Sequence, residues 1–318
     1  MIDLRRLHTL RVLEQQGTVT AAAELLHLTP SAVSHQIAQL GRDLKLQLLE
    51  RHGRRVHLTP AARALVAHAD DVAARWEQAR AKIYAHPEAS GVVRVAGFPS
   101  VIAGLLTPMV RRLRQTHPQL RPVLVEAETQ PGHDMLLAGE ADLAVYATST
   151  SAPVAGASRF QQQPLLEEPL DLLVPSFHRL AQQGEVRVED LEGEEWIVPL
   201  AGTCDFYELT LATCTMAGFA PNIAHRAMDN FAVTAMVGQG LGIAMIPRLA
   251  AALPRGDAVR LPIVSQPRPT RQVHLSIRDG SDSQPAIRAA VEALRAVAEA
   301  FSAEVVLPAG AAAAAGTA

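Results

Sequence analysis

The strongest constraint on this fold is a helical segment from Pro60 to about His86 that contains no proline or glycine after its first residue. Thr59 supplies a cap, and a proline in the first helical turn costs no hydrogen bond. Its apolar side chains repeat every seven or four residues: Leu65, Val72, Trp76 and Ile83. An isolated helix cannot bury such a stripe, so we expect a linker over residues 59–87 that pairs with a second copy of itself.

The residues before this segment have the pattern of three short helices. Leucines at helical spacing define the first helix, which Gly17 ends, and Thr18 then caps a short second one. After a tight connection, Pro30 occupies the first turn of a third helix. Its predicted buried stripe consists of Val33, Ile37, Leu40 and Leu44. The other face of the third helix is therefore left for another purpose.

A basic hairpin is predicted next, because arginines surround Gly53 and the β-prone segment Val56 to Leu58 follows. Residues 1 to 88 hold 12 basic and 9 acidic side chains, against 17 and 23 in the rest of the chain. Three helices and a basic wing describe a winged helix-turn-helix, whose third helix meets base edges in the major groove. The candidate DNA-binding residues are Thr18, Thr29, Pro30, Ser31, Ser34, His35, Gln36, Arg51, Arg54 and Arg55. A three-helix packing unit with a polar surface and a solvated basic loop is the plainer alternative.

Composition changes at PEASG, where we place a hinge at residues 88–91. Beyond it strands and helices alternate, which predicts α/β units with a parallel sheet. Helices are expected from Ser100 to about His117, from about His133, from about Asp205 to Gly218, from Asn230 to Val237 and from Gln284 to Ala303. The Ala-rich tail, residues 304–318, has low complexity and is expected to fray.

These motifs resemble those of the LysR-type transcriptional regulators, a bacterial family. The resemblance rests on TVTAAAELLHLTPSAVSHQIAQL, the Glu50–Arg51 pair, GRRVHLTPAA and VGQGLGIAMIP. It runs to about residue 303, with Gly41 where the family commonly has Glu. It implies a winged helix-turn-helix over 1–58 and a periplasmic-binding-protein-like effector domain over 92–303. That domain would have two α/β subdomains, 92–163 with 264–303 and 164–263. It also implies a homodimer through the linker helix, a homotetramer, and control by a small-molecule effector.

The effector site is expected in the cleft between the subdomains, near strand C-termini and helix N-termini whose N–H groups suit an anion. By resemblance, the candidate effector-binding residues are Phe98, Pro99, Ser100, Thr129, Gln130, Gly202, Thr203, Phe206, Asn230, Phe231 and Val233. Each of Ser100 and Thr203 could equally be a helix cap. Since none of the candidates is Arg or Lys, we expect a neutral or weakly polar effector.

Other functions lack a motif in this sequence. GQGLG follows a predicted helix and precedes a strand, whereas a dinucleotide-binding loop needs the reverse order. There is no GxSxG, GxxxxGK[ST] or HExxH, so no enzyme, cofactor or metal site is predicted. Cys204 and Cys214 have neither metal nor disulfide-framework spacing, which indicates a reducing cytoplasm. No apolar run is long enough for a membrane span.

Two rival functions remain open from the sequence. The first is a solute-binding module with a helical dimerisation region and no DNA affinity. The second is a hydrolase that uses Ser100 or Cys204 in the cleft, although no base can be identified. Cys204 could also be a redox-sensing thiol, but a small pocket or core residue is the simpler interpretation.

Overall fold

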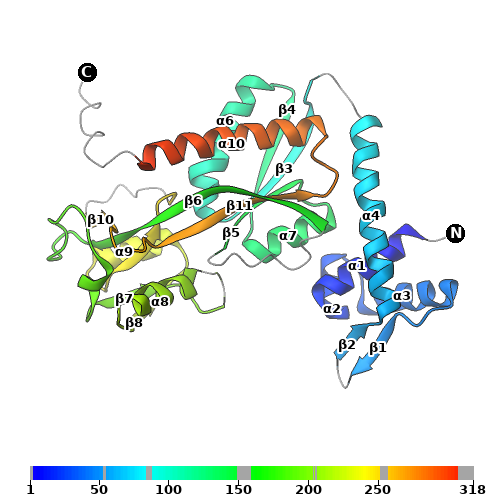
Figure 1. Ribbon diagram of the computed structural model, residues 1–318, viewed down its shortest axis with the longest axis horizontal. Helices are drawn as coiled ribbons and strands as arrows, with labels where there is room; N and C mark the ends of the chain where they lie inside the picture. The colour runs from blue at the N-terminus through cyan, green and yellow to red at the C-terminus, as the bar shows by residue number, and fades with distance from the viewer. Residues whose placement is uncertain are drawn as a thin grey trace.

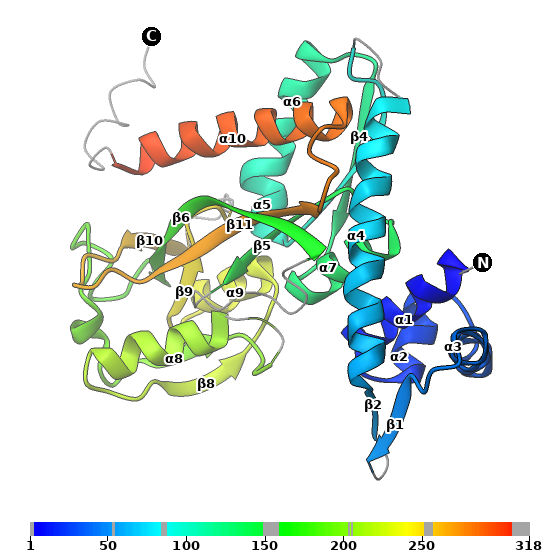
Figure 2. The same ribbon diagram turned by 45° about the vertical axis from the view of Figure 1, so that its right-hand side comes forward.

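The computed structural model describes residues 3–52, 55–83, 88–148, 159–202, 204, 206–250 and 257–306. Only the backbone is described for residues 51, 52, 55, 56 and 304–306. Arg54, Thr203 and most of the tail therefore lie outside the described residues. Figures 1 and 2 show the winged domain at one end of helix α4 and the effector domain along its other half.

The N-terminal domain contains three helices and a hairpin: α1 (Leu4–Gln16), α2 (Val19–Leu25), α3 (Pro30–Leu44), β1 (Leu49–His52) and β2 (Arg55–Leu58). Side-chain oxygens of Thr18 and Thr29 cap α2 and α3 by accepting from backbone N–H groups three residues on. Gly17 ends α1 with a φ of 69°, which is favourable for glycine. The predicted winged helix-turn-helix is confirmed.

Gly41 lies inside α3, where a larger residue would meet the backbone. A Cβ at Gly41 would come within 2.9 Å of the Leu46 carbonyl oxygen. The same residues are joined by a hydrogen bond from Leu46 N to Gly41 O. Glycine thus allows the chain to fold back tightly after α3 and to enter the hairpin.

Helix α4 (Pro60–Ile83) leaves much of its apolar stripe uncovered in the single chain. Thr59 caps it by accepting from Ala62 N at 3.1 Å and donates its own hydroxyl to Gln47 O. Trp76 is 58% exposed and Ile83 is 64% exposed. Large exposed apolar side chains on one helix are typical of a surface that another chain covers.

The effector domain is built on a mixed sheet of seven strands, in the order β10-β6-β11-β5-β3-β4 with β9 beside β6. Its strands are β3 (Gly91–Gly97), β4 (Leu120–Glu126), β5 (Leu143–Thr148), β6 (Phe160–Pro175), β9 (Ala244–Pro247), β10 (Ala258–Pro262) and β11 (Thr270–Arg278). Among the described strands of this sheet, the predicted parallel pairing is found for β3 with β4 and for β3 with β5. Strand β11 runs antiparallel to both β5 and β6. The 16-residue β6 contributes to the cores of both halves of the domain, through Leu166 in one and Leu170 in the other.

Helices cover both halves of the domain. In the first half these are α5 (Pro99–Val101), η1 (Ile102–Leu106), α6 (Thr107–Thr116), α7 (Thr129–Ala138) and α10 (Pro285–Val306). The second half contains η3 (Val188–Leu191), β7 (Glu195–Val198), α8 (Phe206–Met216), β8 (Asn222–Arg226) and α9 (Asn230–Gly238). Trp196, fully buried, lies in the core of the second half. The predicted fold class is confirmed.

Two helices differ from the sequence expectation. The helix expected from Ser100 to His117 contains a π-helical turn, η1, because Pro108 has no N–H to continue the α-helical hydrogen bonds. Helix α7 begins at Thr129 and not near His133. Pro131 lies in its first turn, where an absent N–H costs nothing.

In the GQGLG segment, Gly242 allows two backbone segments to pack closely together. A Cβ at Gly242 would meet the Glu195 carbonyl oxygen at 2.6 Å, and its φ of 142° favours glycine. The close approach brings the start of β7 against the residues before β9, where Ile197 N donates to Ile243 O. The segment follows helix α9 and precedes strand β9. This helix-then-strand order is the reverse of the one that a dinucleotide-binding loop needs, so the segment is not such a loop.

Candidate DNA-binding surface and effector cavity

The first turns of α3 present small polar side chains to solvent. Ser31, Ser34 and His35 are exposed, as are Thr29 and Pro30 at the start of the helix. The opposite face holds Val33, Ile37 and Leu40 in the domain core. The structure therefore leaves these polar residues together on one accessible face, as the major groove requires.

Gln36 lies differently from its neighbours. It is half-buried, and its Oε1 accepts a hydrogen bond from Thr9 Oγ1 at 2.5 Å. Thr9 is itself buried in α1. One end of the Gln36 amide is thus engaged inside the domain, which leaves its Nε2 donors for an outside partner.

The wing is an antiparallel hairpin. Arg51 pairs with Val56 and His52 pairs with Arg55, so Arg51 and Arg55 lie on opposite strands, one position apart in the register and not opposite each other. Arg54, between the strands in sequence, lies outside the described residues. The hairpin directly precedes α4. The Thr59 side chain links the two, because it caps α4 and also donates a hydrogen bond to Gln47 O, just before the hairpin.

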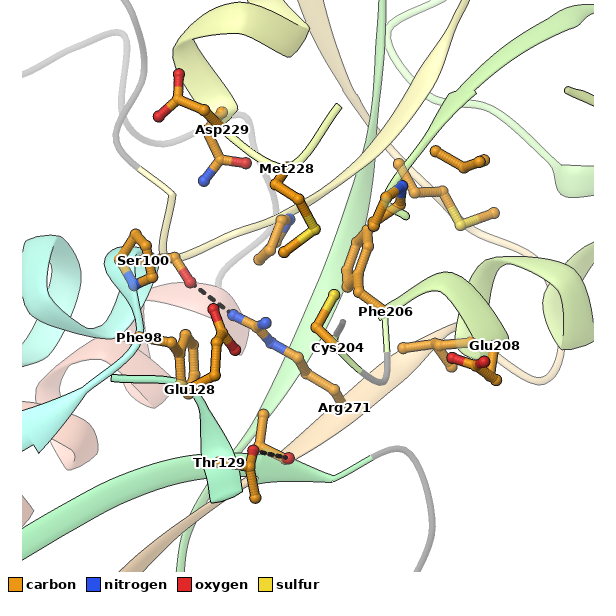
Figure 3. A pocket seen from close by; sticks show the side chains of 18 of the residues that line it. Phe98, Ser100, Glu128, Thr129, Cys204, Phe206, Glu208, Met228, Asp229 and Arg271 are labelled. Atoms are coloured by element: carbon orange, nitrogen blue, oxygen red, sulfur yellow. Dashed lines mark hydrogen bonds between the residues drawn. The ribbon is translucent and has the colours of Figure 1, made fainter. Parts of the chain in front are cut away.

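A cavity of about 480 Å³ lies between the two halves of the effector domain (Figure 3). This volume is within the range of small-molecule sites. Nine of the eleven predicted effector residues line it: Phe98, Pro99, Ser100, Thr129, Gln130, Gly202, Phe206, Asn230 and Val233. They come from the residues that follow β3, from the turn after β7 and from the first turns of α7, α8 and α9.

Phe231 does not belong to the described lining of this cavity. Its side chain is 60% exposed. Asn230 and Val233 are three residues apart on α9 and share a face, whereas Phe231 is rotated about 100° from Asn230. The helical period thus corrects the prediction for Phe231. Thr203 lies outside the described residues.

Arg271, at the start of β11, is a cavity residue that sequence reasoning missed. It is 9% exposed. Its Nε donates to Glu168 at 2.6 Å and its Nη2 donates to Ser100 Oγ at 2.7 Å. Its guanidinium carbon lies 4.6 Å from the centre of the Phe98 ring. The expectation of a lining without Arg or Lys was therefore wrong, because β11 is far from the other lining segments in sequence.

The lining also carries three carboxylates. Glu128 precedes α7, Glu208 lies in the first turn of α8, and Asp229 caps α9 by accepting from Ala232 N at 2.9 Å. Helix N-termini carry a partial positive charge, which stabilises such carboxylates. Among the described lining residues, Arg271 is the sole cationic side chain.

The two cysteines have different surroundings. Cys204 is half-buried and lines the cavity, whereas Cys214 is buried in α8. Burial raises the pKa of the Cys214 thiol to about 12, so it remains protonated at neutral pH. Any thiol chemistry in the cavity would therefore involve Cys204 first.

Helix α7 connects the cavity to the winged domain. Asp134 Oδ1 accepts from Gln130 Nε2 at 2.9 Å, and Gln130 lines the cavity. The same oxygen accepts from Gln15 and Gln16 of α1 at 2.9 and 2.7 Å. One carboxylate thus bonds to a cavity residue and to the DNA-binding domain.

A buried arginine also joins the effector domain to the winged domain and to α4. Arg159, 6% exposed, donates to Asp70 of α4 and forms an ion pair with Glu14 of α1. Asp70 also accepts from Arg11 at 2.5 Å. Apolar side chains of the winged domain and of the first half of the effector domain form one continuous cluster here. The two domains of the described chain are therefore packed as one body.

A second junction involves the other half of α4. Arg278 at the end of β11 donates to Glu77 at 3.0 Å, and Gln284 donates to the second Glu77 oxygen at 2.6 Å. A Cβ at Gly280 would meet the Ala74 carbonyl oxygen at 2.3 Å, so only glycine allows this approach. Figure 2 shows α4 passing beside α7 on the way to this contact.

No group of three or more His, Cys, Asp or Glu side chains placed to hold a metal ion is found in the described part of the chain. Within the same residues, no helix is both long and apolar enough to span a membrane.

Comparison with known proteins matches both halves of the chain. Residues 86–299 match the model of the LysR substrate binding domain, and residues 4–63 match that of the bacterial regulatory helix-turn-helix protein, lysR family. The DNA-binding transcriptional dual regulator OxyR of Escherichia coli is 30% identical over 298 residues, which are 93% of this chain and 95% of that protein. The transcriptional dual regulator GltC of Bacillus subtilis is 29% identical over 82% of this chain and 86% of its own.

Solved structures show the same fold. A full-length OxyR variant from Pseudomonas aeruginosa superimposes with a TM-score of 0.63 at 24% identity, over 93% of this chain and 97% of that chain. Full-length CbnR complexed with its target DNA gives a TM-score of 0.57 at 22% identity, over 93% of this chain and 99% of that one. The chain belongs to the LysR family of DNA-binding transcriptional regulators, with an N-terminal helix-turn-helix domain and a C-terminal substrate-binding domain.

Proposed function

We propose that the cavity between the two halves of the effector domain is the site where a small molecule controls DNA binding. The observation that carries this proposal is the direct link through α7. Gln130 lines the cavity and bonds to Asp134, which in turn accepts from Gln15 and Gln16 of α1. A ligand that engages Gln130 changes the energy of this link, and thus shifts the population of winged-domain arrangements.

In the same proposal, α3 enters the major groove with Ser31, Ser34, His35 and one end of Gln36, while the wing contacts phosphates. Two chains pair through the exposed stripe of α4, which includes Trp76 and Ile83. Dimers then associate as tetramers. Paired recognition helices read half-sites separated by about 34 Å or a multiple of it. Because its target is chromosomal DNA, we place the protein in the cytoplasm.

A DNA-binding titration tests this function. The full chain is added to labelled DNA from upstream of its own gene, at several salt concentrations, and protected sites are mapped. We expect protection of a partly palindromic site and a steep loss of affinity with salt. Absence of protection at moderate salt would contradict the proposal. Trp76→Asp should dissociate the dimer in solution and abolish protection, whereas Phe177→Asp, exposed on the second half of the effector domain, should do neither.

We propose that the cavity binds without catalysis. Ser100 Oγ accepts from Arg271, a cation that cannot serve as a general base. A screen of ester and amide substrates should therefore give no turnover above background. Hydrolysis that Ser100→Ala or Cys204→Ser abolishes would contradict this part of the proposal.

Oxidation of Cys204, which lines the cavity, is a second candidate signal for the control of DNA binding. Several relatives are named hydrogen peroxide-inducible genes activators, among them one from Escherichia coli that is 30% identical over 298 residues. In this chain the second cysteine, Cys214, is buried, and burial raises the pKa of its thiol to about 12, so Cys214 is a poor nucleophile for disulfide formation at neutral pH. If peroxide is the input, DNA protection changes on peroxide addition and Cys204→Ser abolishes the change. Unaltered protection excludes it.

A further inference from the structure

Three arginines lie around Asp171 of strand β6, outside the cavity lining. Arg248 Nε donates to both carboxylate oxygens of Asp171, at 3.1 and 3.0 Å. Arg260 Nη1 donates to the carbonyl oxygen of Arg248 at 3.2 Å. Burial lowers the pKa of Arg268, the charge of Arg248 lowers it further and that of Asp171 raises it, so both groups are its neighbours. We call Arg248, Arg260 and Arg268 the arginine cluster.

The backbone holds Arg268 next to Asp171. Arg268 directly precedes Pro269, whose carbonyl oxygen accepts from Leu170 N at 3.0 Å. The Arg268 residue is half-buried, and its Nε is buried without an acceptor among the described residues. A buried N–H of a charged group that lacks an acceptor destabilises the folded chain. This donor therefore favours an acceptor that a ligand brings.

The two carboxylates beside the cluster are already engaged. Asp171 is 3% exposed and forms an ion pair with Arg248. Glu168, three residues earlier on β6, is fully buried and accepts from Arg271 Nε at 2.6 Å. Each acid thus balances one arginine, and neither is left to balance another cation.

Arg260 has only neutral acceptors among the described residues. Its Nη1 donates to Arg248 O, and its Nη2 donates to Ala250 O at 2.8 Å. Burial lowers the pKa of Arg260, Asp171 opposes this shift and Arg248 adds to it, but a guanidinium remains protonated in a protein. The arginine cluster and Arg271 together supply four positive charges against two carboxylates, which leaves an excess of two.

The cluster lies where the two halves of the domain are joined. Arg248 N donates to Pro169 O of β6 at 3.3 Å. The next residue, Leu249, packs in the core of the first half, whereas Ala250 packs in the core of the second. A Cβ at Gly104 of the first half would lie 2.6 Å from the Leu249 side chain, so the contact is close. An anion bound to the cluster would therefore stabilise one arrangement of the two halves.

We propose that the arginine cluster is a second ligand site of this domain and that it binds a phosphate group, either free or at the end of a phosphorylated metabolite. A phosphate group carries about 1.5 to 2 negative charges at neutral pH, which matches the excess of two positive charges. Guanidinium groups bind phosphate oxygens through several N–H donors at once. Arg268 donates to the phosphate, and the charges of Arg248 and Arg260 add to the attraction. Because the site is outside the cavity, this inference goes beyond the proposed function.

Calorimetric titration of the full chain in a phosphate-free buffer tests the inference. The probes are inorganic phosphate, glycerol phosphate and acetate, with sodium chloride added to keep the ionic strength constant. We expect saturable binding of a phosphate probe, and acetate, with its single charge, should bind about 10-fold more weakly or less. The tighter of the two phosphate probes identifies the source of the ligand. Absence of saturable phosphate binding, or equal affinity for acetate, overturns the inference.

Variants locate the bound phosphate. Arg268→Gln should weaken phosphate binding about 10-fold or more, because the site loses a charge-assisted donor. Arg268→Lys keeps the charge and most of the side-chain length but not the planar fork, so its affinity should lie between those of Arg268→Gln and the wild type. Unchanged affinity in both variants overturns the assignment, and is the result expected if arginines of the DNA-binding surface held the phosphate.

Arg226→Gln is the matched control. It makes the same change in charge at an exposed position on β8, which belongs to the separate two-stranded sheet of the second half. This variant should bind phosphate as the wild type does. Equal weakening in Arg226→Gln and Arg268→Gln would show a general effect of net charge and overturn the site. Melting curves without phosphate check that every variant is folded.

Discussion

At the residue scale, His133 is a buried histidine beside the cavity helix. It is fully buried in α7, its Nδ1 lies 2.8 Å from Thr129 O, and the ring of Tyr146 meets it edge-on. Burial lowers the pKa of His133, although the Thr129 carbonyl and Asp134 oppose the shift. The native state therefore keeps the imidazole neutral at pH values where the unfolded chain would protonate it.

This difference predicts a pH dependence of stability. Below the ordinary value of 6.5 and above the lowered folded pKa, the unfolded state binds more protons than the native state. The contribution of His133 to the free energy of unfolding is therefore fully present above pH 6.5. It falls as the pH decreases, by at most about 1.4 kcal/mol per pH unit. His133→Gln should reduce the slope in urea titrations from pH 7 to 5. His68→Gln, exposed on α4, should leave it unchanged, and equal slopes for both would contradict the assignment.

The proposed DNA contacts of single residues are of two kinds: base contacts, which give sequence preference, and phosphate contacts, which do not. Gln36→Ala should relax preference at one base position, by about 1–3 kcal/mol of discrimination, and should lower stability by about 1 kcal/mol through loss of the Thr9 bond. Arg54→Ala should weaken binding to all sequences alike and flatten the salt dependence. Competition binding with single-base variants measures both effects. Identical behaviour of the two variants would show that this division of contacts is incorrect.

The exposure of individual side chains was predictable where a local signal existed. Ser31, Ser34 and His35 follow a helix cap and alternate with buried apolar residues, so their exposure was readable from spacing. Arg271 carried no such signal, because its partners Ser100 and Glu168 are 171 and 103 residues away. Long-range pairs of this kind depend on the strand order of the sheet, which no periodicity specifies.

At the element scale, α4 is held to the effector domain by a buried ion pair. Asp70 accepts from Arg159 and Arg11, and the three side chains are largely buried. Among the described residues, Asp70→Ala would leave Glu14 as the one anionic partner of the buried Arg159, at a cost on the order of 3–5 kcal/mol. Chemical denaturation should show this loss. Asp71→Ala, exposed on the next position, should change stability by less than about 0.5 kcal/mol.

The elements themselves were mostly predictable. Apolar periodicity placed α1, α3, α8 and α9 within a few residues, since their caps and stop signals are local. The exceptions have backbone causes: Pro108 forces the π-helical turn η1, and Pro131 is tolerated in the first turn of α7. The full length of β6 has no local sequence signal, because most of its first residues are polar and half-exposed and give no strand pattern.

At the scale of the whole molecule, the strongest consequence of this architecture is reciprocal coupling between effector and DNA. Asp134 accepts from the cavity residue Gln130 and from Gln15 and Gln16 of the winged domain. By linkage, a ligand that changes DNA affinity by some factor must have its own affinity changed by DNA by the same factor. Removing the shared carboxylate should reduce both effects together.

Asp134→Ala is therefore expected to bring the ratio of DNA affinities with and without effector close to 1, from a typical coupling of about 5- to 150-fold. Asp134 is outside the described cavity lining, so effector affinity in the absence of DNA should change little. Glu140→Gln provides a matched control, because its exposed pair with His27 also joins the two domains but makes no contact with a cavity residue. Anisotropy titrations with and without the effector measure the ratio. If Asp134→Ala retained full coupling while Glu140→Gln lost it, the signal would pass along the surface and not through α7.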